Sequence, residues 1–167
     1  MISYSSSAAM AAICAPVQYP TQYGVKELRR VLKKNPDLSS NGFITHRTRD
    51  CFERMRVDTF KSPRFALEFD DCCRVLATAK RVKTPTVGSY GLKHTVERLV
   101  GNYISNGALI CAAIALGFTT KHSGPNVLVG VSMQTWRAWQ KQSQCRGWVE
   151  RDQRPADWDF GSTKANE

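Results

Sequence analysis

The sequence lacks the paired cysteines that zinc-binding folds use. Its six cysteines are spread along the chain without a Cys-x-x-Cys pair and without regular spacing, so a zinc ribbon or finger is not expected. Cys51, Cys72 and Cys111 fall at apolar positions of predicted helices, where a cysteine behaves as a small hydrophobic residue. We therefore expect reduced thiols, no bound metal and no cofactor.

Long apolar runs are also missing. No segment approaches the length of a transmembrane helix, and the N-terminus has neither the basic start nor the continuous apolar stretch of a secretory signal. The chain has no glycine-rich loop that could cradle phosphates and no recognisable nucleophile with a base. These absences predict a cytoplasmic protein that does not bind membranes, and they favour a binding protein over an enzyme.

Acidic residues are scarce beside basic ones. The 167 residues include 14 Asp and Glu against 24 Lys and Arg, which gives a formal net charge of +10. A protein this basic is attracted to polyanions, of which nucleic acid is the commonest. Basic residues also form ordinary solvated surfaces, so charge alone does not separate nucleic acid from an acidic protein face as the partner. Nothing in the sequence indicates the oligomeric state.

The most clearly patterned stretch runs from Ser89 to Phe118. From Leu92 to Tyr103, apolar side chains recur at helical spacing, with Tyr103 as the last inward position. Residues 108–116 carry no polar side chain on any face, and Gly117 follows where a left-handed helix end is expected. We predict a buried core helix there. Because it presents nothing polar to base edges, the pair of helices is not expected to read DNA as a helix-turn-helix.

Apolar periodicity predicts further helices at residues 24–34, 45–57, 63–79 and 133–142, the last capped by Ser132. A β-branched run at 127–131 is expected to pair with residues 118–121. The predicted fold is mainly α: a single helical domain at 24–145 with a minor β-hairpin near residues 118–131, a flexible N-terminal arm at 1–23 and an irregular C-terminal tail at 146–167.

About half of the charge excess lies on the first two predicted helices. Nine basic and four acidic residues lie between Gly24 and Arg56, and the pattern places Arg56 on the outer face. A basic linker at 80–83 and two tryptophans offer further contacts with phosphates and bases. The candidate residues for binding nucleic acid or another partner are Arg29, Arg30, Lys33, Arg47, Arg49, Lys80, Arg81, Lys83, Trp136 and Trp139.

One segment resembles a known group of proteins. Residues 89–94 (SYGLKH), then Glu97 and residues 103–108 (YISNGA), are similar to a segment of small uncharacterised proteins of phages, plasmids and other bacterial mobile elements. The resemblance covers residues 89–118 and implies a setting but no reaction. Within it, five residues either form a polar network that fixes the central helices or line a binding surface: Ser89, Tyr90, His94, Glu97 and Asn106. We favour the network, because buried polar groups must find partners.

These observations lead to one hypothesis with two alternatives. The hypothesis is a non-enzymatic accessory protein of a phage or mobile element. It docks a basic helical surface on nucleic acid or on the acidic face of a host nucleoprotein complex. Inhibition of host defence is one role that such docking could serve. The first alternative is a DNA-binding regulator or plasmid maintenance protein. The second is a small enzyme that uses His94 and Glu97 as acid and base.

Overall fold

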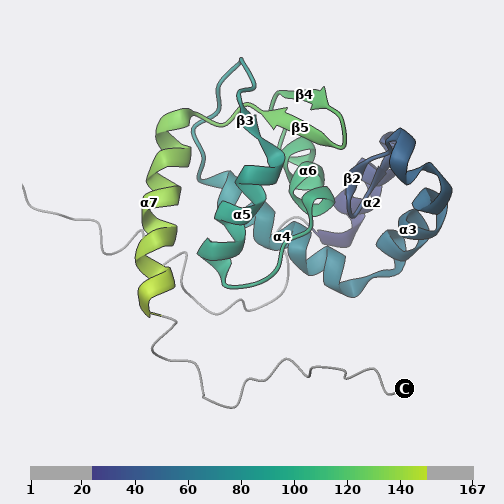
Figure 1. Cartoon of the computed structure of the whole chain (residues 1–167), viewed down its shortest axis with the longest axis horizontal. Helices are drawn as coiled ribbons and strands as arrows, with labels where there is room; N and C mark the ends of the chain where they lie inside the picture. The colour runs from purple at the N-terminus through teal and green to yellow at the C-terminus, as the bar shows by residue number, and fades with distance from the viewer. Residues whose placement is uncertain (1–23, 150–167) are drawn as a thin grey trace, which may run out of the picture.

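The structure, a computed structural model, describes residues 24–149, with side chains through residue 144 (Figure 1). The expected N-terminal arm at 1–23 lies outside the described residues, as do residues 150–167 of the expected tail.

The described chain forms six α-helices, one 3-10 turn and five short strands. In order they are α2 (Gly24–Lys34), β1 (Leu38–Ser39), β2 (Gly42–Phe43), η1 (His46–Thr48), α3 (Arg49–Lys61), α4 (Pro63–Ala77), β3 (Val87–Gly88), α5 (Ser89–Val100), α6 (Asn106–Ala115), β4 (Thr120–Ser123), β5 (Asn126–Val129) and α7 (Met133–Val149). The prediction of a mainly α fold with a minor hairpin is confirmed. None of these helices has both the length and the apolar character needed to cross a membrane.

Helix α6 lies at the centre of the fold, where it packs on α4, α2 and α5. Residues 106–113 are all buried. At its start the Ser105 hydroxyl accepts a hydrogen bond from the Ala108 N–H at 3.3 Å, and after its end Gly117 has a φ of 73°, which glycine adopts without steric cost. The prediction of a buried core helix with a glycine end is confirmed.

Helix α4 provides the main wall against α6. Pro63 stands at its first position, and the hydroxyl of Ser62 accepts a hydrogen bond from the Phe65 N–H at 3.2 Å. The inward face buries Phe65 and Phe69 and continues to Leu76. The helical spacing read from the sequence is therefore the spacing of the observed core face.

The predicted hairpin is one part of a slightly larger sheet. Strands β4 and β5 are antiparallel, with Thr120 opposite Val129 and Ser123 opposite Asn126. Strand β3 pairs with the other edge of β5, so the order is β3-β5-β4. The strands β3, β1 and β2 have two residues each, which is too short for any alternation of apolar and polar side chains to announce them.

The end of α5 differs from the expectation. The helix stops at Val100, and Gly101 follows in the left-handed region with a φ of 76°. The break ends the helical spacing, so Tyr103 leaves the inward stripe and is exposed. The expectation that Tyr103 faces the core is wrong.

Two other boundaries also move. Residues 45–48 form a tight turn in which the Thr48 hydroxyl accepts the Thr45 N–H at 3.0 Å, and α3 then runs to Lys61. Helix α7 continues to Val149, so residues 146–149 are helical where an irregular tail was expected. The cap at the start of α7 is confirmed, because the Ser132 hydroxyl accepts the Thr135 N–H at 3.1 Å.

Candidate functional site

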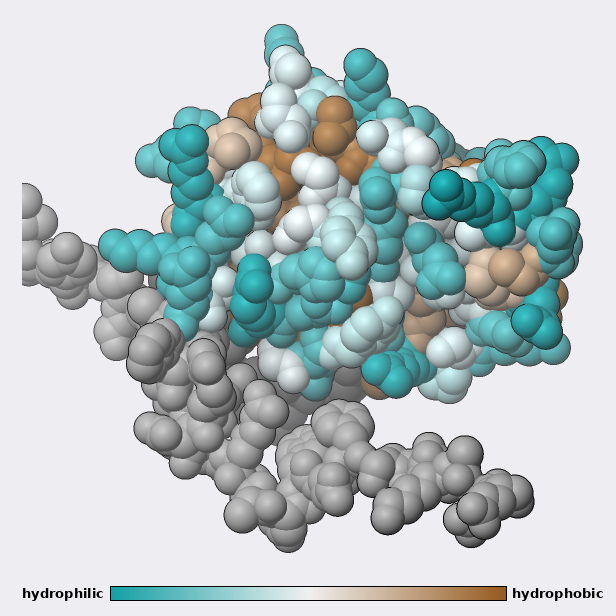
Figure 2. Space-filling model, in the orientation of Figure 1, coloured by the Kyte–Doolittle hydropathy of each residue, from teal (hydrophilic) through white to brown (hydrophobic). Residues whose placement is uncertain are grey.

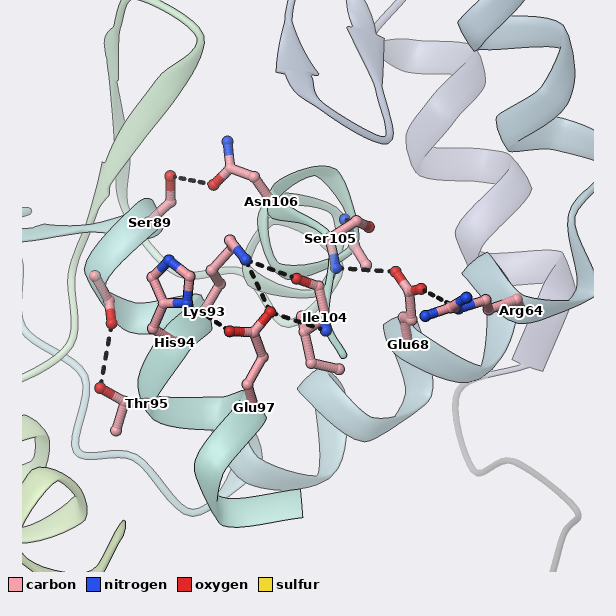
Figure 3. A network of polar contacts seen from close by, with 12 residues as sticks. Arg64, Glu68, Ser89, Lys93, His94, Thr95, Glu97, Ile104, Ser105 and Asn106 are labelled. Carbon is pink, nitrogen blue, oxygen red and sulfur yellow. Dashed lines mark hydrogen bonds and ion pairs between the residues drawn. The ribbon is translucent and has the colours of Figure 1, made fainter. Parts of the chain in front are cut away.

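The turn between α5 and α6, residues 101–105, is held by an ion pair on α5 (Figure 3). Lys93 Nζ lies 2.8 Å from Glu97 Oε1 and donates to the carbonyl of Ile104 at 3.1 Å. The same Glu97 oxygen accepts the Ile104 N–H at 3.2 Å. One ion pair therefore fixes both backbone groups of Ile104, and the buried Lys93 ammonium has two partners.

The pKa of Glu97 reflects two opposing influences. Burial raises the pKa, but hydrogen bonds from Lys93, from the Ile104 N–H and from His94 outweigh burial and hold it below its usual range. His94 Nδ1 lies 2.5 Å from Glu97 Oε2, as expected for residues three apart on a helix. Among the described residues no hydroxyl or thiol hydrogen-bonds to His94.

A second carboxylate holds the same turn from α4. Glu68 Oε2 accepts the Ser105 N–H at 2.9 Å, and Glu68 Oε1 lies 3.2 Å from Arg64 Nε. The Glu68 side chain is 8% exposed, whereas that of Arg64 is 71% exposed. The carboxylate is thus withdrawn into the protein while the guanidinium remains at the surface.

Two exposed tyrosines, Tyr90 and Tyr103, adjoin these ion pairs; we call them the tyrosine pair. They are 57% and 56% exposed. Lys93 Nζ lies 5.5 Å from the centre of the Tyr90 ring and 5.1 Å from that of Tyr103. The Arg64 guanidinium lies 5.3 Å from the Tyr103 ring centre, and the His94 ring meets Tyr90 edge to face at 4.7 Å. Cations thus lie within cation–π range of both rings.

A cleft of about 270 Å³ opens beside Tyr103. Its lining comes from the turn between β1 and β2, the end of α3, the start of α4 and the 101–105 turn. Hydrogen-bonding side chains on the lining include Ser40, Asn41 and Asp58, together with the Arg64 and Glu68 pair. The exposed aromatic ring and the cleft therefore share one rim.

The five residues of the expected polar network fall into two groups. Ser89 and Asn106 are buried and link α5 to α6, with the Ser89 hydroxyl 2.9 Å from Asn106 Oδ1. The same hydroxyl accepts the Val127 N–H at 3.1 Å, and Asn106 Nδ2 lies 3.0 Å from Asn126 Oδ1. These contacts tie the two helices to β5. Tyr90, His94 and Glu97 belong to the other group, around Lys93.

The first basic candidates lie on α2, η1 and α3. Arg29, Lys33, Arg47 and Arg49 are exposed and make no ion pair within residues 24–144, whereas Arg30 is paired with Glu27. In Figure 2 hydrophilic residues gather at the end of the molecule where Figure 1 shows α3. These cations are available to an external anion.

Arg56 does not belong to that surface, and its expected outward position is wrong. Its guanidinium donates to the backbone carbonyls of Leu32, Asn35 and Leu38 at 2.7, 3.1 and 2.6 Å. The carbonyls at the end of a helix have no partner within it, and Arg56 supplies one from α3. The side chain is therefore structural.

The basic linker lies apart from α2 and α3. Lys80, Arg81 and Lys83 are exposed, but their backbone runs beside the start of α7, where the Ser132 N–H donates to the Lys80 carbonyl at 2.9 Å. Arg81 also lies over the Phe118 ring at 4.9 Å. Figure 1 shows the linker on the side of β3 and α7, away from α3. The candidate cations thus do not form one patch.

The two candidate tryptophans both pack on the core. Trp139 is buried in the core. Trp136 packs against the core, and its Nε1 donates to the Thr95 hydroxyl at 3.2 Å. The Trp139 ring is therefore closed to stacking, whereas the Trp136 ring is half-buried.

Sequence reasoning missed Arg64, Glu68 and the role of Tyr103. Arg64 and Glu68 carry a detectable signal, because opposite charges four residues apart on a helix face one another. Tyr103 could have been found from Gly101, since a glycine after an amphipathic stretch is a common helix end.

Among the described residues no group of three or more His, Cys, Asp or Glu side chains is placed to hold a metal ion. No protein-family model, curated protein or solved structure matches the chain. The function is therefore inferred from the residues and their geometry.

Proposed function

We propose that the protein binds nucleic acid through the exposed cations of α2, η1 and α3, which we call the basic surface: Arg29, Lys33, Lys34, Arg47, Arg49 and Arg54. The observation that carries the proposal is that these side chains are exposed and make no ion pair within residues 24–144. By contrast, the less exposed side chains of Arg56 and Lys93 are bound within the protein, Arg56 to backbone carbonyls and Lys93 to Glu97. Unpaired cations on one region of a chain of net charge +10 suit a polyanion.

The basic surface rests on a connected support. Arg56 bonds α3 to the end of α2, and Phe52 of α3 is buried. Because the two helices are bonded to each other, the backbone positions of their cations are fixed. Binding therefore costs less conformational entropy. Helices that present cations in this way contact phosphates without reading sequence.

The biological setting forms part of the proposal. The resemblance of residues 89–118 favours an accessory protein of a phage or other mobile element that works in the cytoplasm, where it would meet nucleic acid or a host nucleoprotein complex. Inhibition of host defence is one role consistent with such contact. A DNA-binding regulator is the alternative, and it differs by preferring particular duplex sequences.

A salt titration tests the proposal. Fluorescence anisotropy with labelled single-stranded and double-stranded DNA and RNA should give association constants whose logarithm falls linearly with the logarithm of salt concentration. The double variant Arg47→Glu, Arg49→Glu should weaken binding and lower the slope by about one for each phosphate that the protein no longer neutralises.

The matched control is Lys80→Glu, Lys83→Glu, which changes the net charge equally on the linker. It should keep a larger part of the affinity, because the linker lies away from the basic surface. Equal losses in both variants would mean that overall charge acts, with no localised surface. Absence of binding at low salt would remove the proposal and direct attention to an acidic protein partner.

A further inference from the structure

The tyrosine pair is a surface feature that packing does not explain. Tyr90 and Tyr103 leave more than half of their area to solvent, yet both rings are tied to the same buried ammonium of Lys93. The separation of the ring centres is at most the sum of their two distances to Lys93 Nζ. The exposed part of each ring is aromatic surface of the kind on which bases stack.

The backbone that carries Tyr103 is fixed. The next two residues, Ile104 and Ser105, are bound by Glu97, Lys93 and Glu68 through three backbone hydrogen bonds. The Tyr90 ring contacts Lys93 and His94 of the same helix. A ring already fixed in place loses little freedom when a ligand stacks on it.

The exposed charge next to the Tyr103 ring is that of Arg64, and Asp58 is an exposed acidic residue on the cleft lining. The Glu68 and Glu97 side chains are only 8% and 18% exposed, whereas Arg64 beside Tyr103 is 71% exposed. Aromatic rings flanked by an exposed guanidinium match the two parts of a nucleic-acid strand, because bases stack on the rings and phosphates attract the cation. A duplex keeps its bases stacked inside and cannot use the rings.

We propose that the tyrosine pair stacks the unpaired bases of single-stranded nucleic acid, and that the cleft beside Tyr103 receives the edge of one base. The cleft supplies hydrogen-bonding groups from Ser40, Asn41 and Asp58, the kinds of group that contact the edges of splayed bases. This inference rests on the proposed function and adds the class of nucleic acid that the protein prefers.

The test compares two strands that differ only in their bases. Fluorescence anisotropy of the full chain with a labelled oligothymidine and with an abasic strand of the same length separates base stacking from phosphate attraction. Oligothymidine should bind about tenfold more tightly or better, since stacking on one aromatic side chain contributes roughly that factor. The variant Tyr90→Leu, Tyr103→Leu should lose most of this preference, and Tyr90→Phe, Tyr103→Phe should keep it.

The outcomes separate the two proposals. Equal affinity of the unaltered protein for both strands overturns the stacking platform and leaves the basic surface standing. Absence of salt-dependent binding of either strand overturns both. A base preference that persists in a folded leucine variant also overturns the platform, and because the strand comparison uses the unaltered protein, the test does not depend on the variant folding.

Discussion

Helices α3 and α5 use an inward cation in different ways. Helix α3 buries only Phe52 and Thr59 and is joined to α2 by the bonds of Arg56 to backbone carbonyls. Helix α5 buries six residues, among them Leu92 and Leu99, and its Lys93 is paired on the same helix. Helix α3 thus depends more on polar bonds to its neighbour, whereas α5 depends more on apolar packing. We expect α3 to open at lower free energy than the core.

The largest expected effect comes where the two regions meet, at Gly107 of α6. Its N–H donates to the Ser40 carbonyl at 2.7 Å, and a Cβ built on it would lie 1.9 Å from the Ser39 carbonyl oxygen. Gly107→Ala should therefore push the β1–β2 turn off the core and lower the free energy of unfolding by about 3 kcal/mol or more. Urea denaturation followed by circular dichroism measures this loss.

Gly91→Ala is the control for that substitution. Gly91 lies in α5, and an added Cβ would meet only Trp136 Cζ2, at an ordinary 3.5 Å. Alanine in a helix interior is favoured over glycine by up to about 1 kcal/mol, so this variant should be as stable as the original or more so. If Gly107→Ala is equally well tolerated, the contact between α6 and the β1–β2 turn is not as close as described.

The next prediction removes the bond between α3 and α2. Arg56→Met keeps the length of the side chain but leaves the carbonyls of Leu32, Asn35 and Leu38, from the end of α2 to β1, without this donor. We expect the free energy of unfolding to fall by about 2–4 kcal/mol. Hydrogen exchange should show the loss of protection mainly in α3 and at the end of α2, because the rest of α2 and the central helices keep their apolar contacts.

Arg54→Met is the matched control on the same helix. Arg54 is exposed, so its loss should change stability by less than about 0.5 kcal/mol while weakening nucleic-acid binding. The two arginines lie two residues apart, yet replacing Arg56 should mainly lower stability and replacing Arg54 should mainly weaken binding. A large stability loss for Arg54→Met, or none for Arg56→Met, would reverse the assignment of their roles.

The helices differ in how far the sequence predicts them. Helices α4 and α6 were predictable because the information is local: a starting proline and helical spacing of apolar side chains in α4, and a wholly apolar run followed by Gly117 in α6. The inward turn of Arg56 was not predictable, because its partners are carbonyls 18 to 24 residues away along the chain. Periodicity assigns a charged residue to the outer face and carries no information on distant backbone groups.

The candidate site was only partly predictable for the same reason. The pairing of His94 with Glu97 follows from their spacing on one helix. The contribution of Glu68 depends on α4 lying against the 101–105 turn, and the exposure of Tyr103 depends on the helix break at Gly101. Both are consequences of tertiary arrangement.

A third prediction concerns pH and the central ion pair. The pKa of Glu97 in the folded protein lies below its ordinary value of 4.5, so ionised Glu97 stabilises the fold above that value, and the contribution is lost as the pH falls through the lower folded pKa. Glu97→Gln should therefore cost about 1–3 kcal/mol near neutral pH. The difference from the unaltered protein should shrink below pH 4.5, as measured by urea denaturation across a pH series.

The control for the pH series is Glu53→Gln, on the exposed part of α3. It should show little difference from the unaltered protein at any pH, since Glu53 makes no ion pair among residues 24–144. A gap between the Glu97→Gln variant and the unaltered protein that stays constant down to acid pH would contradict a stabilising role for the ionised carboxylate.

The smallest expected effect tests whether Trp136 serves core packing or the binding of a partner. Its Nε1 donates to the Thr95 hydroxyl at 3.2 Å, which joins α7 to α5. A double-mutant cycle with Trp136→Phe and Thr95→Val should give a coupling free energy of about 0.5–1.5 kcal/mol, and Trp136→Phe should leave nucleic-acid affinity unchanged. Absence of coupling together with a weaker affinity for single strands would instead place Trp136 on the binding surface. Replacing a ring that contacts an external partner changes affinity, whereas replacing a ring that only packs in the core changes only stability.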